Sequence, residues 1–125
     1  MAVTHLEALR TILADAVDAH VNTGAGTAVV RIRDSTTTLV DFDLANPAFG
    51  AAAAGVITLE STPIAAVASG DGDADNAQII NRNADISLAC SVTATGMGGD
   101  IEVDNVSIAT SQNCSLESLT YTAPL

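Results

Sequence analysis

The stretch Ala28-Val-Val-Arg-Ile-Arg33, followed by Thr38-Leu-Val-Asp-Phe-Asp-Leu44, decides the fold class of this chain. In both runs apolar and polar side chains alternate with a period of two, which is typical of half-buried strands. Polar residues 34–37 separate the runs, so we predict a β-hairpin. The hairpin would place arginines opposite aspartates on its outer face, where opposite charges help to fix the register. We assign a structural role to four of these residues, Arg31, Arg33, Asp41 and Asp43.

Upstream of the hairpin, the apolar residues recur at helical spacing, which predicts an amphipathic helix over residues 3–21. Thr4 and Glu7 form a capping-box pattern at its start. Asn22-Thr-Gly24 supplies a stop signal, so we place the helical segment within residues 1–23. The predicted apolar face consists of Leu6, Leu9, Ile12, Leu13, Ala16, Val17 and His20.

Downstream of the hairpin, short apolar runs are separated by turn signals, which predicts seven or eight short strands in all. No strand–helix alternation follows, so a parallel Rossmann-like sheet is not expected. We predict a single domain over residues 1–125 that is mainly β (α+β). Its N-terminal helix would pack on an antiparallel β-sandwich or jelly-roll-like barrel formed by residues 27–125. The later strands are expected at 55–60, 63–68, 86–93 and 116–122, with 77–82 a weak candidate, and with 101–103 and 106–108 as either two strands or one bent strand.

The charge of the chain excludes several classes of function. Fifteen acidic residues face four arginines and no lysine, which gives a net charge of −11. Such a surface repels nucleic acids and anionic membranes. Only Phe42, Phe49 and Tyr121 are aromatic, which argues against a base-stacking platform. We also expect neither a signal peptide nor a membrane-spanning helix, because no long continuous apolar run is present.

The alternating carboxylates Asp71, Asp73 and Asp75 are the one metal-site candidate. They resemble the first half of an EF-hand loop, which requires Gly at its sixth position and Glu at its twelfth. Here Asn76 and Arg82 occupy those positions, so the EF-hand interpretation fails. A looser calcium site remains as an alternative to an acidic, solvated turn, which we favour.

No other residues form a chemical motif. His5 and His20 would lie about 22 Å apart on one helix, too far to share a metal. Cys90 and Cys114 match no metal spacing, and two buried thiols are favoured over a disulfide. No nucleophile elbow, phosphate loop or dinucleotide motif is present. We therefore expect neither catalytic residues nor a cofactor, and we do not expect an enzyme.

Three segments stand out: Asn46-Pro-Ala-Phe-Gly-Ala-Ala-Ala-Ala-Gly-Val-Ile-Thr-Leu59, Ile101-Glu-Val-Asp-Asn-Val-Ser-Ile108 and Leu119-Thr-Tyr-Thr-Ala-Pro124. Together with the helix that runs into Gly24-Ala-Gly26, they resemble small structural proteins of tailed bacteriophages. The similarity extends in order over most of the chain and is poor over residues 61–85. What this resemblance implies is a virion component, most closely a capsid decoration or cement protein.

The resemblance leads to specific expectations. The protein would assemble in the host cytoplasm onto the outer surface of the phage head, with the major capsid protein lattice and further copies of itself as partners. A component of the tail, neck or tail tube is the first alternative. A calcium-dependent carbohydrate-binding or adhesin module is the second, and it would need the three aspartates. The expected contact residues are Asn46, Pro47, Phe49, Leu6, Leu9 and Leu13, although Phe49 could instead fill the core.

Overall fold

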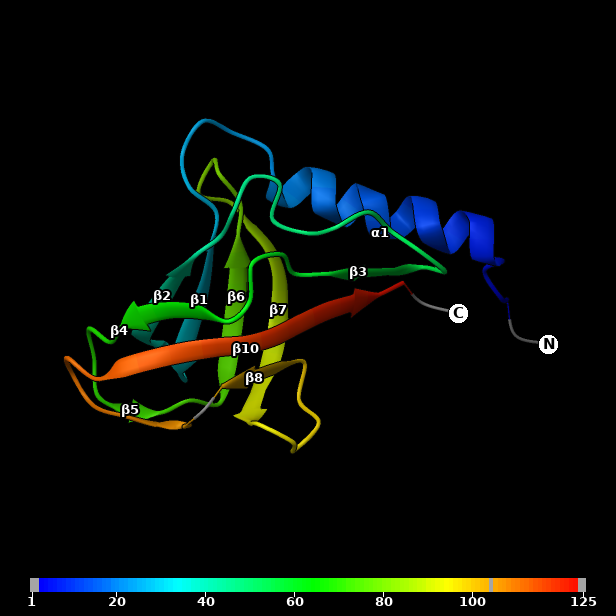
Figure 1. Cartoon of the computed structure of the whole chain (residues 1–125). Helices are drawn as coiled ribbons and strands as arrows, with labels where there is room; N and C mark the ends of the chain where they lie inside the picture. The colour runs from blue at the N-terminus through cyan, green and yellow to red at the C-terminus, as the bar shows by residue number, and fades with distance from the viewer. Residues whose placement is uncertain (1–2, 104, 124–125) are drawn as a thin grey trace.

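The computed structural model describes residues 3–103 and 105–123. The protein is mainly β, and one N-terminal helix packs on a nearly closed, barrel-like sheet (Figure 1). This agrees with the predicted fold class. The elements are α1 (Glu7–Val21), β1 (Val29–Asp34), β2 (Thr37–Asp43), β3 (Val56–Thr58), β4 (Ile64–Val67), β5 (Gly72–Asp73), β6 (Asn76–Ile80), β7 (Ile86–Ala94), β8 (Ile101–Val103), β9 (Ser107–Ile108) and β10 (Asn113–Thr122).

The main sheet follows the order β2-β1-β6-β7-β8-β10-β3, and β4 also pairs with β10. The segment after β4 returns to β2, where the Ser69 N–H donates to the Leu39 carbonyl oxygen at 2.8 Å. This bond brings the two ends of the curved sheet together. The short strands β5 and β9 form a separate two-stranded sheet. All of the strand pairs are antiparallel except β7 with β8.

The parallel pair β7–β8 is joined by only six residues, 95–100. Parallel neighbours normally need a connection of a dozen residues or more. Glycines make the tight return achievable, since Gly96 has φ 87° and Gly98 has φ 86°. The N–H groups of both glycines donate to one carboxylate oxygen of Glu102, at 3.1 and 3.2 Å. The loop is thus fastened to the strand that it precedes.

The predicted β1–β2 hairpin is confirmed, with one difference in register. Arg31 lies opposite Asp41, and its Nε lies 2.9 Å from Asp41 Oδ1. The hydrogen bond to Asp41 raises the pKa of Arg31 above its usual value. A register shift after Ile32 places Arg33 opposite Thr38 rather than opposite an aspartate. One of the two expected charge pairs therefore does not form.

We expect the Arg31–Asp41 pair to contribute little stability. Both side chains are more than a third exposed, and exposed ion pairs are worth about 0–1 kcal/mol. A double-mutant cycle with Arg31→Ala and Asp41→Ala, measured by urea unfolding, should give a coupling free energy within that range. A coupling of several kcal/mol would show that the pair governs the register.

The helix differs from its prediction at both its start and its buried face. It begins at Glu7, and its N-cap Leu6 makes no side-chain capping hydrogen bond, so the predicted Thr4–Glu7 capping box is wrong. Its buried residues are Ala14 and Val21, neither of which belongs to the predicted apolar face. Across the part of the chain described, no helix is long and apolar enough to cross a membrane.

The described residues form more strands than expected, because β5 lies in the segment expected to be a solvated turn, and β8 and β9 are separate strands rather than one bent strand. β6 had the least regular pattern in the sequence, yet it lies in the middle of the sheet. Its buried residues Ala77 and Ile79 alternate with the half-buried Asn76 and Gln78, and only the buried Ile80 breaks this alternation. The core also buries two of the three aromatic side chains, Phe42 and Phe49.

Candidate functional site

The first half of the apolar side of α1 faces away from the barrel, whereas Val17, in its second half, packs against the core. The opposite side of the helix makes the contacts: Arg10 Nε donates to the Ala123 carbonyl oxygen at 3.2 Å, and the Gly55 N–H donates to Thr11 Oγ1 at 3.2 Å. Ala14 packs between these contacts and the core. Figure 1 shows the helix lying across one end of the barrel beside β3. Hydrogen bonds of Arg10 and Thr11, together with the packing of Val17 and Ala14, therefore attach α1 to the barrel.

The side chains left outside form a continuous apolar stripe. Leu6 is 77% exposed, Leu9 45% and Ile12 63%, and Leu13 is half-buried beside them. At 100° per residue these four positions fall within an arc of about 120°, and no acidic residue of the helix falls inside that arc. We call Leu6, Leu9, Ile12 and Leu13 the helix stripe. Three of these residues were expected to be contact residues from the sequence.

The other expected contact residues lie in the loop before β3, where some are exposed and one is buried. Asn46 and Pro47 are exposed, and the adjacent Ala48 N–H donates to Asn22 Oδ1 at 2.9 Å, which ties the loop to the end of α1. Phe49 is only 1% exposed and belongs to the core cluster. The structure therefore supports the alternative in which Phe49 fills the core. Asn46 and Pro47 stay accessible for contact with a partner.

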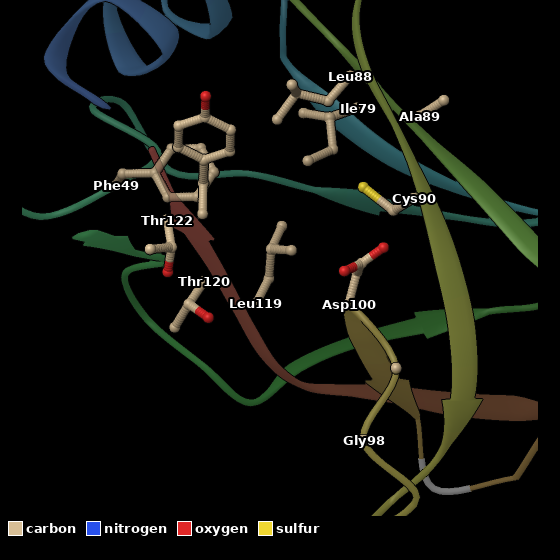
Figure 2. Close-up of a pocket in the computed structure, with 12 residues that line it drawn as sticks. Phe49, Ile79, Leu88, Ala89, Cys90, Gly98, Asp100, Leu119, Thr120 and Thr122 are labelled. Carbon is tan, nitrogen blue, oxygen red and sulfur yellow. The ribbon is translucent and has the colours of Figure 1, made fainter. Parts of the chain in front are cut away.

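A groove opens in the barrel wall between the first half of β7 and the last half of β10. Its volume is about 500 Å³, within the range of ligand sites. Its apolar floor includes Leu88 and Cys90 from β7 and Leu119 and Tyr121 from β10, and Asp100 lies at one end. Figure 2 shows Leu88 and Cys90 on one side, Leu119 on the other and Asp100 below. We call this feature the β7–β10 groove.

The groove continues toward the helix. A second hollow of about 610 Å³ is lined by Leu13, His20 and Ile86, and Tyr121 borders both hollows. His20 Nδ1 and Ser87 Oγ are hydrogen-bonded at 2.6 Å, which joins the last turn of α1 to β7. This bond agrees with a structural role for His20 at the end of the helix. His5 lies at the other end, before the first turn.

The one thiol in the groove is not an activated nucleophile. Burial, followed by the negative charge of Asp100, raises the pKa of Cys90 to about 11. A thiol with this pKa stays protonated at neutral pH, and the thiolate is the reactive form. Cys90 therefore acts in the floor of the groove as a small apolar side chain. Cys114 is also a thiol and is buried.

Alkylation of Cys90 should accordingly require unusually high pH. In a Cys114→Ala background, we expect the rate with iodoacetamide at pH 8 to be about 100-fold below that of a thiol of ordinary pKa, and to rise steeply toward pH 11. The same shift predicts that stability falls between about pH 9 and pH 11, because the unfolded thiol loses its proton first. Mass spectrometry and thermal unfolding measure the two effects. A rate that levels off near pH 9 would contradict the first.

Two of the three candidate calcium ligands, Asp71 and Asp75, accept hydrogen bonds from main-chain N–H groups of different segments. Asp71 accepts a hydrogen bond from the Thr110 N–H, which lowers the pKa of Asp71. Asp75 accepts from the Ser35 N–H at 3.2 Å. Within residues 3–103 and 105–123, no group of three or more His, Cys, Asp or Glu side chains is placed to hold a metal ion. The interpretation of an acidic, solvated turn is the one that fits these contacts.

The groove was absent from the sequence-based prediction. The alternation at 86–93 indicated which side chains of β7 point inward. It did not indicate that the first half of β7 pairs with a described strand on one side only. Comparison of the chain with protein-family models, with curated proteins and with solved structures finds no match. The candidate functional features are therefore the helix stripe, the exposed Asn46–Pro47 turn and the β7–β10 groove.

Proposed function

We propose that the protein is a virion structural protein that decorates the outer surface of a phage head and strengthens the contacts between capsomers. The observation that carries the proposal is the helix stripe. A contiguous run of large apolar side chains on the surface of a small domain is typical of a protein–protein contact. The stripe includes Leu6, Leu9 and Leu13, which were expected to bind the lattice.

The charge of the chain supports a position on the outside of the shell. A net charge of −11 with no lysine is unfavourable next to packed nucleic acid. The three acidic residues of α1, Glu7, Asp15 and Asp18, point away from the helix stripe, so the repulsive charges are separated from the apolar contact. The resemblance to phage structural proteins provides the class of partner, which is the major capsid protein lattice.

A binding experiment with phage heads that lack this protein tests the proposal. We expect the purified wild-type protein to bind to such heads and to raise the temperature at which they release DNA. A variant with Leu6→Gln, Leu9→Gln and Ile12→Gln should lose at least about tenfold in affinity, since three large side chains would no longer be buried on binding. Its unfolding temperature should stay close to that of the wild type, because these side chains lie outside the core.

The matched control carries Val67→Gln and Met97→Gln, which replace exposed apolar residues elsewhere on the surface. This control should bind heads like the wild type. Binding that survives the triple substitution would contradict the role of the helix stripe. Rings or tubes of the purified protein without heads, in negative-stain images, would instead favour the tail, neck or tail-tube alternative. Calcium-dependent binding to glycans would favour the adhesin alternative.

A further inference from the structure

Along most of their length, the two strand edges that border the β7–β10 groove have no strand of the described residues between them. β8 lies between β7 and β10 only opposite Val92–Ala94 of β7. From Ile86 to Cys90, β7 pairs with β6 on one side and with no described strand on the other. At 3.3 Å per residue this open edge is about 16 Å long. It is long enough for a segment of about five residues.

Main-chain groups of β7 point into the groove. The Ser91 N–H donates to Asp100 Oδ2 at 2.9 Å, on the side of β7 that faces away from β6. The direction of main-chain hydrogen bonding alternates along a strand of an antiparallel pair. Ala89, two residues earlier, therefore also directs its N–H and C=O away from β6. These two groups lie at the edge of the groove.

Main-chain groups of β10 point into the groove from the other side. The Leu119 carbonyl accepts from the Leu59 N–H at 2.9 Å, and the Ala123 N–H donates to the Gly55 carbonyl at 2.8 Å. Both bonds face the β3 side, so by the same alternation Thr120 and Thr122 direct their N–H and C=O groups toward β7. The groove therefore has donors and acceptors along both walls, and these can satisfy one inserted strand.

The side chains around the groove define what that strand would carry. An inserted strand places alternate side chains inward, against the apolar floor of Leu88, Cys90, Leu119 and Tyr121, and the others outward into solvent. Asp100 adds a carboxylate at one end, and neither the groove nor the hollow beside it is lined by an arginine. A basic residue at that end of the segment would complement the charge.

We propose that the β7–β10 groove binds an extended segment of another protein, which completes the barrel wall as an added strand. The segment carries apolar side chains at alternate positions and a basic residue beside Asp100. β8 already pairs with both β7 and β10, so a bound segment would occupy the same position between these two strands, beyond the end of β8. A second copy of this chain is a poorer occupant, because two chains of net charge −11 repel each other and offer no lysine. Strand addition of this kind is an established mode of peptide recognition.

The site is separate from the helix stripe, so its test is independent of phage heads. The probes are two synthetic peptides, Arg-Thr-Val-Thr-Val-Thr-Val and Val-Thr-Val-Thr-Val-Thr-Arg, with blocked ends, because either strand direction is antiparallel to one wall. We expect one of them to bind saturably in NMR titrations, with amide shifts centred on Ala89, Thr120 and Thr122. Binding should also slow the alkylation of Cys90 at pH 10.

Two matched peptides separate strand addition from simple apolar contact. A version that is N-methylated at alternate residues keeps every side chain but loses main-chain donors, and it should bind at least about tenfold more weakly. A version with its three valines contiguous keeps the composition but loses the alternation, and it should weaken similarly. Equal binding by either control peptide, or the absence of saturable binding by both probes, would overturn the proposal.

Protein variants provide the reciprocal test. Ala89→Pro removes a donor that faces the groove and spares the β6 ladder, whereas Ala89→Thr at the same position keeps the donor. We expect loss of peptide binding for the first and wild-type binding for the second. If Ala89→Pro does not fold, the N-methylated peptide still decides the question. Asp100→Asn should weaken the arginine peptide but not one that ends in Gln. Protection of Cys90 by concentrated protein alone, with dimers in sedimentation, would make a second copy the occupant and overturn the proposal.

Discussion

Replacement of Phe49 by alanine is expected to lower the free energy of unfolding by about 3–5 kcal/mol, the usual cost of removing a buried aromatic ring. Phe49 is 1% exposed, and it forms an isolated bridge with Leu59, which keeps the loop before β3 against the core. The total stability of a domain of this size is about 5–15 kcal/mol, so the loss is a large fraction of it. Urea unfolding followed by circular dichroism measures the change.

Asn46→Ala is the matched control, because Asn46 lies in the same loop and its side chain is exposed. We expect it to change the stability by less than about 0.5 kcal/mol. The pair of variants separates the two roles considered for this loop. If Phe49→Ala left the stability unchanged and abolished binding to heads, Phe49 would be a contact residue and its burial in the core would be wrong.

Replacement of Gly24 by alanine should be the second most damaging change. Gly24 has φ 115°, and an added Cβ would lie 2.5 Å from both the Arg82 carbonyl carbon and the Asn83 nitrogen. Such an overlap with backbone cannot be relieved by rotating a side chain. We expect the overlap to lower the free energy of unfolding by about 1–3 kcal/mol, and the left-handed conformation to lower it by about a further 1–2 kcal/mol.

Gly96→Ala provides the matched control for this glycine. Gly96 also has a positive φ, 87°, but an added Cβ there would meet no atom within 4 Å. Gly96→Ala should therefore lower the free energy of unfolding only by the contribution of the left-handed conformation, about 1–2 kcal/mol. The difference in unfolding free energy between the two variants measures how closely the 24–26 loop packs on the β6–β7 turn. Equal costs would show that this packing relaxes freely.

The sequence was most informative where polar and apolar residues alternate in step with the exposed and buried faces of a strand. The β1–β2 hairpin was predicted with its Arg31–Asp41 pair because polar and apolar residues alternate cleanly there. The shift that moves Arg33 was not predictable, since a bulge changes the register without changing the alternation on either side.

The sequence misled at α1, where large apolar residues on one face of the helix are exposed. Periodicity places Leu6, Leu9 and Ile12 on one face of a helix, and the usual inference is that this face packs on the core. In this protein Ala14, Val17 and Val21 contact the core, and Leu6, Leu9 and Ile12 are exposed. A pattern shows that side chains share a face, but it does not show what covers that face.

The β7–β10 groove lay beyond sequence-based prediction for a topological reason. It exists because two strands distant in the chain separate after a short third strand ends. The residues of β7 have the same alternation whether or not a neighbour lies beside them. Only the pairing pattern of the complete sheet shows which main-chain groups are left without a partner.

The six-residue loop between β7 and β8 also determines the length of β7 along which the groove is open. For β8 to slide along β7 and fill the opening, it would have to advance by two residues, about 7 Å, to recover its hydrogen-bonding pattern. A loop of this length, already reversing direction and bound to Glu102, has no spare chain to supply that distance. The short loop therefore keeps the β7–β10 groove open. Insertion of a few residues after Ala94 would give β8 enough chain to move along β7 and close the groove.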